Sequence, residues 1–118
     1  MKIEKTLSKM FPGTSKLVIE LVVEYALRCA HAEIAAESLI AVQECCNVTI
    51  KRPVLNMSEN ELDYQCRCYE HKNLANNSAA YGMLRYAKLT GAIPAQYDVD
   101  DIWLNALTSA RDMLSELV

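Results

Sequence analysis

The segment from Thr14 to Arg52 contains neither glycine nor proline, and this constrains the fold more than any other feature of the chain. These two residues are the usual interrupters of helices, so a long helix is permitted here. Apolar residues recur along the segment at the spacing of one helical face. They are Val18, Leu21, Val22, Tyr25, Cys29, Ala32, Ala36, Leu39 and Ile40. We therefore expect one helix over residues 15–46, with a break near His31 as the alternative.

Such a helix would be about 48 Å long at 1.5 Å per residue, which exceeds the width of a compact domain of this size. It must either bend or project toward a partner. The middle of its apolar face carries small side chains that allow another helix to approach closely. They are Ala30, Ala32, Ala35 and Ala36. This Ala-rich face predicts contact with a further helix, which belongs either to the same chain or to the second subunit of a homodimer.

Local signals predict shorter helices in the rest of the chain. The capping box Ser58-Glu-Asn-Glu61 begins a helix over residues 59–73, because serine and glutamate satisfy each other's exposed backbone amides. Asn77 or Ser78 can begin another over residues 78–90, which Gly91 ends. Between the long helix and residue 59 we expect an extended connector that contains Pro53 rather than a strand.

The two ends of the chain also read as helical. Asp98 or Asp100 can begin a last helix, whose apolar stripe continues to Leu117. The stretch Ile3–Met10 is expected to form a turn or two, ended by Pro12. Together these segments predict an all-α fold, an irregular bundle of four to five helices with one long N-terminal helix, as a single domain over residues 1–118.

Composition agrees with a single domain, because 52% of the residues are apolar and can build a core without disulfides or metal. The charged N-terminus is not followed by the apolar segment of a signal peptide, so we expect a cytoplasmic protein with reduced thiols. The longest dense apolar run, Leu17–Leu27, contains two glutamates and is too short to span a membrane.

Cysteine and histidine concentrate between positions 45 and 71, which raises the question of a zinc site. The residues concerned are Cys45, Cys46, Cys66, Cys68 and His71. Cys66 and Cys68 are two positions apart, so on a helix they point about 200° away from each other, which does not suit a shared ion. We interpret Cys66 as a core residue and assign no metal ligand. A zinc-stabilised helical scaffold remains an alternative if the connector brings Cys45 and Cys46 onto the second helix.

The sequence offers no support for catalysis or a bound cofactor. It contains no Gly-rich phosphate loop, no Gly-x-Ser-x-Gly, no His-Glu-x-x-His and no Glu-x-x-His pair. A net charge of −3 and a pI near 5.3 disfavour nucleic acid as the partner. A helical DNA- or RNA-binding regulator is kept as an alternative. Its best basic face would be formed by Tyr81, Arg85, Tyr86 and Lys88.

An acidic surface is the more suggestive feature. On a continuous helix Glu33, Glu37 and Glu44 project in one direction, where they could bind a partner protein with a basic surface. Solubility alone is the plain alternative. We therefore expect a non-catalytic protein–protein interaction protein. At the level of class, this description fits a small acidic inhibitor or decoy of phage or mobile-element type that acts on host machinery, as anti-CRISPR proteins do.

Overall fold

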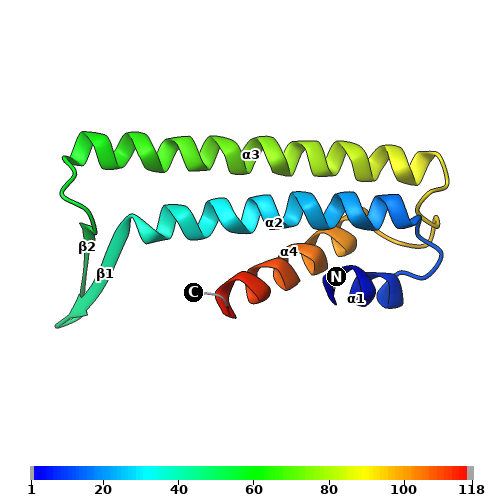
Figure 1. Ribbon diagram of the computed structural model, residues 1–118, viewed down its shortest axis with the longest axis horizontal. Coiled ribbons are helices and arrows are strands. Elements are labelled where there is room, and N and C mark those ends of the chain that lie inside the picture. Colours follow the sequence, from blue (N-terminus) through cyan, green and yellow to red (C-terminus); the bar gives the residue numbers. More distant parts are fainter. Residues whose placement is uncertain (1, 117–118) are drawn as a thin grey trace.

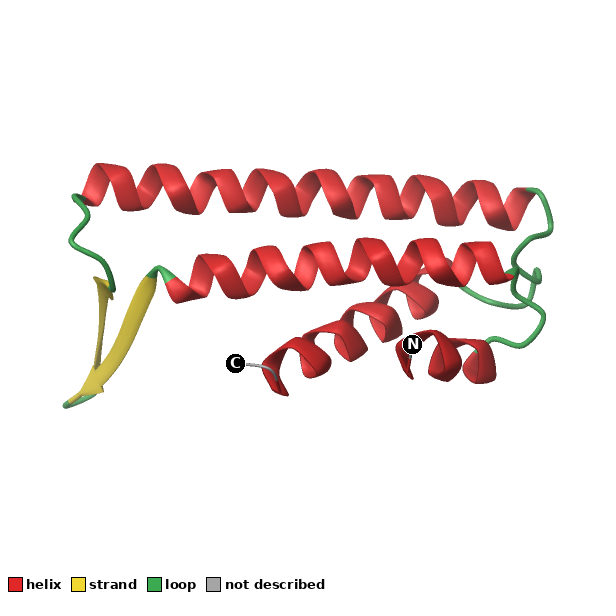
Figure 2. Cartoon of the chain, in the orientation of Figure 1, coloured by secondary structure: helices red, strands yellow, loops and turns green. Residues whose placement is uncertain are grey.

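The computed structural model describes residues 2–116, which form four helices and a two-stranded antiparallel sheet (Figure 1). In chain order the elements are α1 (Lys2–Met10), α2 (Lys16–Ser38), β1 (Ile40–Cys45), β2 (Val48–Pro53), α3 (Glu59–Leu89) and α4 (Val99–Glu116). The helices α2 and α3 run antiparallel along the long axis of a 50 × 25 × 24 Å molecule. α1 and α4 pack against α2, and the β-hairpin extends from the opposite end (Figure 2).

The hydrophobic core occupies one end of this elongated shape. Every buried residue of the described segment 2–116 lies either between Ile3 and Ala32 or between Ala80 and Ala110. The largest fully buried side chains include Leu7, Ile19 and Leu84. None of residues 33–79 is buried, although this segment includes the end of α2, the whole hairpin and more than half of α3. We call residues 33–79 the arm.

The expected all-α fold is wrong in one respect, because the chain is mostly helical but also contains the hairpin. The helix predicted over residues 15–46 ends at Ser38 instead, and it is continuous through His31. From Ile40 onward the chain pairs with residues 48–53 around a two-residue turn. Beyond the end of the core a longer α2 would lack tertiary packing, and an isolated helix is only marginally stable. Pairing with a second strand satisfies the backbone N–H and C=O groups of this segment instead.

The second half of the chain differs in a similar way. The helices predicted over residues 59–73 and 78–90 are a single helix, α3, of 31 residues. Asn77 and Ser78 are good helix starters, but here they lie inside a helix that packs along α2. The result is not the expected bundle of four to five helices. It is a long antiparallel helix pair with two shorter helices at one end.

Several local predictions are confirmed. Glu61 donates its backbone N–H to the Ser58 hydroxyl at 3.2 Å, and the Glu61 carboxylate accepts the Ser58 N–H, which is the expected capping box. α3 ends at Leu89, and Gly91 follows with a φ of +81°, a conformation that glycine adopts without strain. The Asp98 carboxylate accepts the Asp100 N–H at 3.0 Å, at the predicted start of α4.

The hairpin turn carries the most unusual backbone of the described chain. Cys45 pairs with Val48, so the loop consists of Cys46 and Asn47, which have φ values of 52° and 65°. Positive φ at both loop residues is the pattern of a type I′ turn, whose twist matches that of the two strands. Asparagine tolerates this conformation well. Cysteine does not, because its Cβ crowds the following carbonyl.

Replacing Cys46 with glycine should therefore stabilise the hairpin, because glycine removes the left-handed strain of about 1 kcal/mol. Amide hydrogen exchange gives the readout. The amides of Gln43 and Ile50, which face each other in the ladder, should exchange several-fold more slowly in Cys46→Gly. Cys45→Gly is the control, because Cys45 lies in the strand and glycine there weakens it. Faster exchange in Cys46→Gly would contradict the proposed source of strain.

Candidate interaction surface

The arm exposes an unusual amount of apolar surface. Six large apolar side chains on it are more than half exposed: Val42, Val48, Val54, Leu55, Tyr64 and Leu74. The chain as a whole exposes 7970 Å², whereas a compact monomer of 13.2 kDa exposes about 6,400 Å². The radius of gyration is 17.2 Å, against about 13.5 Å for a compact domain of this length. The excess surface reflects the elongated shape of the chain, and we take the exposed apolar surface of the arm as the candidate interaction surface.

The hairpin leaves both outer strand edges open. Val54 donates its N–H to the Leu39 carbonyl at 3.0 Å, which makes residues 39 and 54 a hydrogen-bonded pair. Because such pairs alternate along an antiparallel ladder, the backbone groups of Ile40, Val42 and Glu44 point outward from β1. On β2 the outward positions are 49, 51 and 53, where Lys51 and Pro53 stand. Lysine and proline at an edge discourage further strand pairing, so β1 has the more accessible edge.

The structure does not bring the three predicted partner-binding glutamates onto one helical face. Glu33 and Glu37 lie on α2, but Glu44 lies in β1, beyond the end of that helix. The prediction of a shared face depended on a helix that continued to residue 46. Glu37 and Glu44 are exposed. Glu33 is instead engaged within the chain and is therefore a poor contact for a partner.

Glu33 links α2 to α4 at the point where the core ends. Arg111 of α4 donates two hydrogen bonds to its carboxylate, from Nε at 2.7 Å and from Nη2 at 2.8 Å. The nearby Asn73 side chain of α3 makes a smaller contribution to the lowered pKa of this carboxylate. The hydrogen bond from Arg111 is the largest cause of a lowered pKa for Glu33, and partial burial opposes it. The paired carboxylate thus stays ionised and holds α4 against α2.

The cysteine cluster of the sequence is dispersed in space. Cys66 is only half-buried and lies in the arm, outside the hydrophobic core, so its interpretation as a core residue is wrong. Cys45 and Cys46 lie at the exposed tip of the hairpin, with their sulfurs 3.7 Å apart, rather than at the end of a helix. Within residues 2–116, no three His, Cys, Asp or Glu side chains are grouped so as to hold a metal ion. The connector therefore does not assemble the alternative zinc site.

Cys29 is the buried cysteine of α2 and behaves as a packing residue. Its thiol donates a weak hydrogen bond to the Asn73 carbonyl, with a sulfur–oxygen distance of 3.8 Å. Burial, followed by the negative charge of Glu33, raises the pKa of Cys29 to about 11. A thiol with this pKa is protonated at neutral pH and is a poor nucleophile. Its position on the predicted apolar stripe is confirmed.

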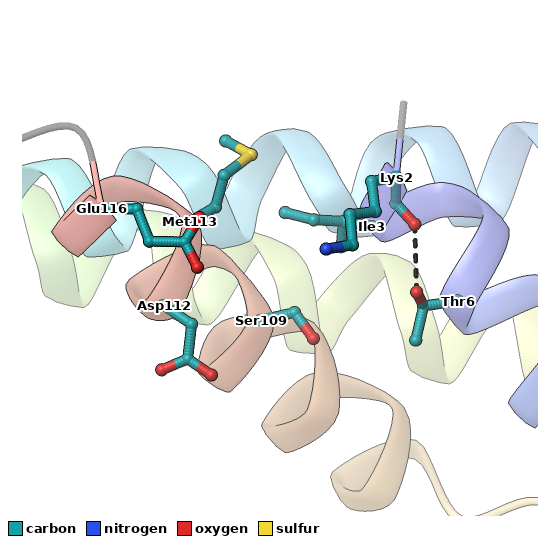
Figure 3. Close-up of a pocket in the computed structure, with 7 residues that line it drawn as sticks. All are labelled: Lys2, Ile3, Thr6, Ser109, Asp112, Met113 and Glu116. Carbon is teal, nitrogen blue, oxygen red and sulfur yellow. Dashed lines mark hydrogen bonds between the residues drawn. The ribbon is translucent and has the colours of Figure 1, made fainter.

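A pocket of about 240 Å³ lies between α1 and α4 (Figure 3). Its walls include Ile3, Thr6, Ser109 and Asp112, and neither cysteine nor histidine lines it. The Thr6 hydroxyl donates to the Lys2 carbonyl at 3.0 Å, and the Asp112 carboxylate points away from Ile3. The polar groups therefore do not converge on a common point, as a nucleophile and its base would have to do.

The basic face expected of a nucleic-acid binder is also divided. The Tyr81 ring packs near Trp103, with 6.2 Å between ring centroids, and the Arg85 guanidinium lies over the Tyr81 ring. Tyr86 points to another side of α3 and is 70% exposed. The arm itself carries seven acidic and four Lys or Arg residues, which does not favour a polyanionic partner.

The feature that sequence reasoning missed is the open edge of β1. The signal was present, because apolar and polar residues alternate from Val48 to Lys51 and an asparagine suited to a tight turn precedes them at position 47. The absence of glycine at the turn concealed the hairpin. The apolar periodicity therefore predicts a helix over Val42 and its neighbours.

Comparison with known proteins yielded no relative: no family model matches the chain, and neither a curated protein nor a solved structure resembles it significantly. Among the helices of residues 2–116, none combines the length and apolarity needed to cross a bilayer.

Replacing Glu33 with glutamine should lower the free energy of unfolding by about 0.5–1 kcal/mol at pH 7, since the ion pair is partly exposed. The pKa of Glu33 is lowered from its ordinary value of 4.5, so the pair stabilises the folded state above that pH and its contribution disappears as the pH falls further. Denaturant unfolding followed by the fluorescence of Trp103 measures both values. Glu37→Gln on the same helix is the matched control. An equal effect at pH 3 and pH 7 would contradict the electrostatic origin.

Thiol labelling should separate the cysteines by position. At pH 8, iodoacetamide should modify Cys45 and Cys46 readily, because both are exposed. Cys29 should stay unmodified until the chain unfolds, since a pKa of about 11 leaves roughly one thiolate in a thousand at this pH, and burial blocks access. Peptide mass spectrometry in the presence and absence of denaturant gives the readout. Rapid labelling of Cys29 in the native protein would show that α2 and α3 separate in solution.

Proposed function

We propose that this chain is a non-catalytic protein–protein interaction protein that binds its partner through the β-hairpin, by addition of a partner strand to the outer edge of β1. The observation that carries the proposal is the open β1 edge at the tip of an arm in which no residue is buried. An isolated two-stranded hairpin is marginally stable in water, and a third strand would stabilise it.

The two edges of the hairpin are not equivalent, which gives the proposal its direction. Lys51 and Pro53 occupy outward positions of β2, and both disfavour further pairing. Ile40, Val42 and Glu44 occupy the outward positions of β1, where each can donate and accept a backbone hydrogen bond. Recognition by strand addition obtains affinity from these main-chain bonds and specificity from the flanking side chains.

The side chains of β1 indicate the chemistry of the partner. Val42 is 61% exposed and offers an apolar contact, and Glu44 on the same face offers a negative charge. With seven acidic and four Lys or Arg residues, the arm as a whole is negative. We therefore propose a protein partner with an extended segment that combines apolar and basic residues. An acidic inhibitor or decoy of phage type is one form that such a binder takes.

A pair of proline substitutions tests the proposal. Val42 and Lys51 face each other across the hairpin, and both N–H groups point outward, so proline at either position breaks no bond inside the hairpin. We expect Val42→Pro to reduce partner capture by at least about tenfold, because it removes a main-chain donor and blocks the β1 edge. Lys51→Pro, the matched control, should capture the partner as the unaltered protein does.

The measurement is affinity capture from a lysate of the source cells, with quantitative mass spectrometry of the captured proteins and circular dichroism to verify folding. One stoichiometric protein that is lost only with Val42→Pro supports strand addition at β1. Equal capture by both variants, or loss in both, contradicts it. Capture of nucleic acid without protein would support the regulator alternative instead.

A further inference from the structure

The face of α3 that points away from α2 is free of charge over the length of the helix. At 100° per residue, Tyr64, His71, Ala75, Ser78, Gly82, Tyr86 and Leu89 fall within a sector of about 80°. We call these seven exposed residues the outer stripe. No Asp, Glu, Lys or Arg of α3 falls within this sector, whereas the solvent side of an exposed helix is normally charged. Figure 1 shows no other element of the chain along this side of α3.

Neither a close contact within the chain nor the backbone conformation requires glycine at position 82, in the middle of the outer stripe. A Cβ atom built at this position meets no other atom within 4 Å, and its φ is not positive. Glycine inside a helix is nevertheless unfavourable relative to alanine. Its neighbours Ala75 and Ser78 are also small, while Tyr86 and Leu89 are 70% and 86% exposed. This pattern is typical of a close helix crossing, in which a second helix approaches the backbone at the glycine.

The charges beside the stripe indicate which helix fits. The N-terminal half of α3, residues 59–74, has four acidic and two basic residues. The C-terminal half, residues 75–89, has Arg85 and Lys88 and no acidic residue. Two copies of α3 in antiparallel orientation would therefore place the negative half of each against the positive half of the other, with opposed helix dipoles. A parallel pair would place like charges together.

The surface area of the chain agrees with a second copy. Each chain exposes roughly 1,500 Å² more than a compact monomer of its mass, as the scaling of area with mass shows. An interface of standard size removes about 800 Å² from each partner. The excess area of each chain is thus larger than the area that a dimer interface along α3 would bury. Such a dimer leaves both hairpins free, at opposite ends.

We propose that two copies of this chain form an antiparallel homodimer in which their outer stripes pack together. Centring the two-fold axis between Asn76 and Asn77 places Tyr64 against the second copy's Leu89 and His71 against its Gly82. In the same register Ala75 lies against Ser78. This interface replaces the one predicted on the Ala-rich face of α2, because Ala30 and Ala32 are already buried within the chain.

The test is light scattering coupled to size exclusion, over concentrations from micromolar to hundreds of micromolar. We expect the unaltered protein to have twice the mass of the 13.2 kDa chain. Gly82→Glu should weaken dimerisation by roughly 30-fold or more, because it places a charged side chain at the crossing. The same change improves helix propensity, and a Cβ atom at position 82 has no neighbour within 4 Å in the monomer, so loss of folding does not confound the result.

Matched Leu→Glu variants locate the interface. Leu89→Glu lies on the outer stripe and should dissociate the dimer, whereas Leu104→Glu, at an exposed position of α4, should not. A monomeric unaltered protein at hundreds of micromolar overturns the proposal. A dimer that resists Gly82→Glu, or that Leu104→Glu dissociates, also overturns it.

Disulfide formation tests the orientation. In a background with Cys45 and Cys46 changed to serine, Tyr64→Cys and Leu89→Cys are made as separate proteins and then mixed. The antiparallel register predicts that oxidation cross-links the mixture and neither protein alone. Cross-linking of Leu89→Cys with itself would show a parallel arrangement and overturn the antiparallel one.

Discussion

The packing of α2 is the constraint on which the rest of the structure depends. This helix contacts each of the other three helices and the first strand. It can do so because Ala26 and Ala30 are fully buried and allow its neighbours to approach closely. The buried part of α2 ends at Ala32, so the core is confined to one end of the molecule. The remaining length of α2 has α3 as its main helical neighbour, and the arm is the consequence.

The Glu33–Arg111 pair marks where this change takes place. On one side of it α2 is enclosed, as the burial of Cys29 and Ala32 shows. On the other side no residue is buried until Ala80, in the second half of α3. Surface ion pairs contribute little to stability in general. This one has bidentate geometry, so its importance lies in fixing the position of α4 rather than in its energy.

The sequence predicted those elements that depend on local chemistry. The capping box at Ser58 and the glycine at position 91 act within a few residues, and both stand where expected. The extent of the helices could not be predicted in this way. The apolar stripe of the long helix predicts that residues 39–46 are helical, but their pairing with residues 48–53 depends on contacts outside that window. The break expected near Ser78 failed because packing along α2 outweighs a local preference for capping.

The continuity of α3 across the core and the arm has a consequence for the order in which the molecule opens. Its C-terminal half is fixed by buried Leu84 and Ala87, whereas its N-terminal half has no buried residue. One unbroken helix thus spans regions of unequal local stability. Local unfolding of α3 should start at its N-terminal end, next to Ser58, and should extend no further than about Ala80. The capping box at the distal end opposes this fraying. During folding, α3 should grow outward from the core, and the hairpin should acquire its final position last.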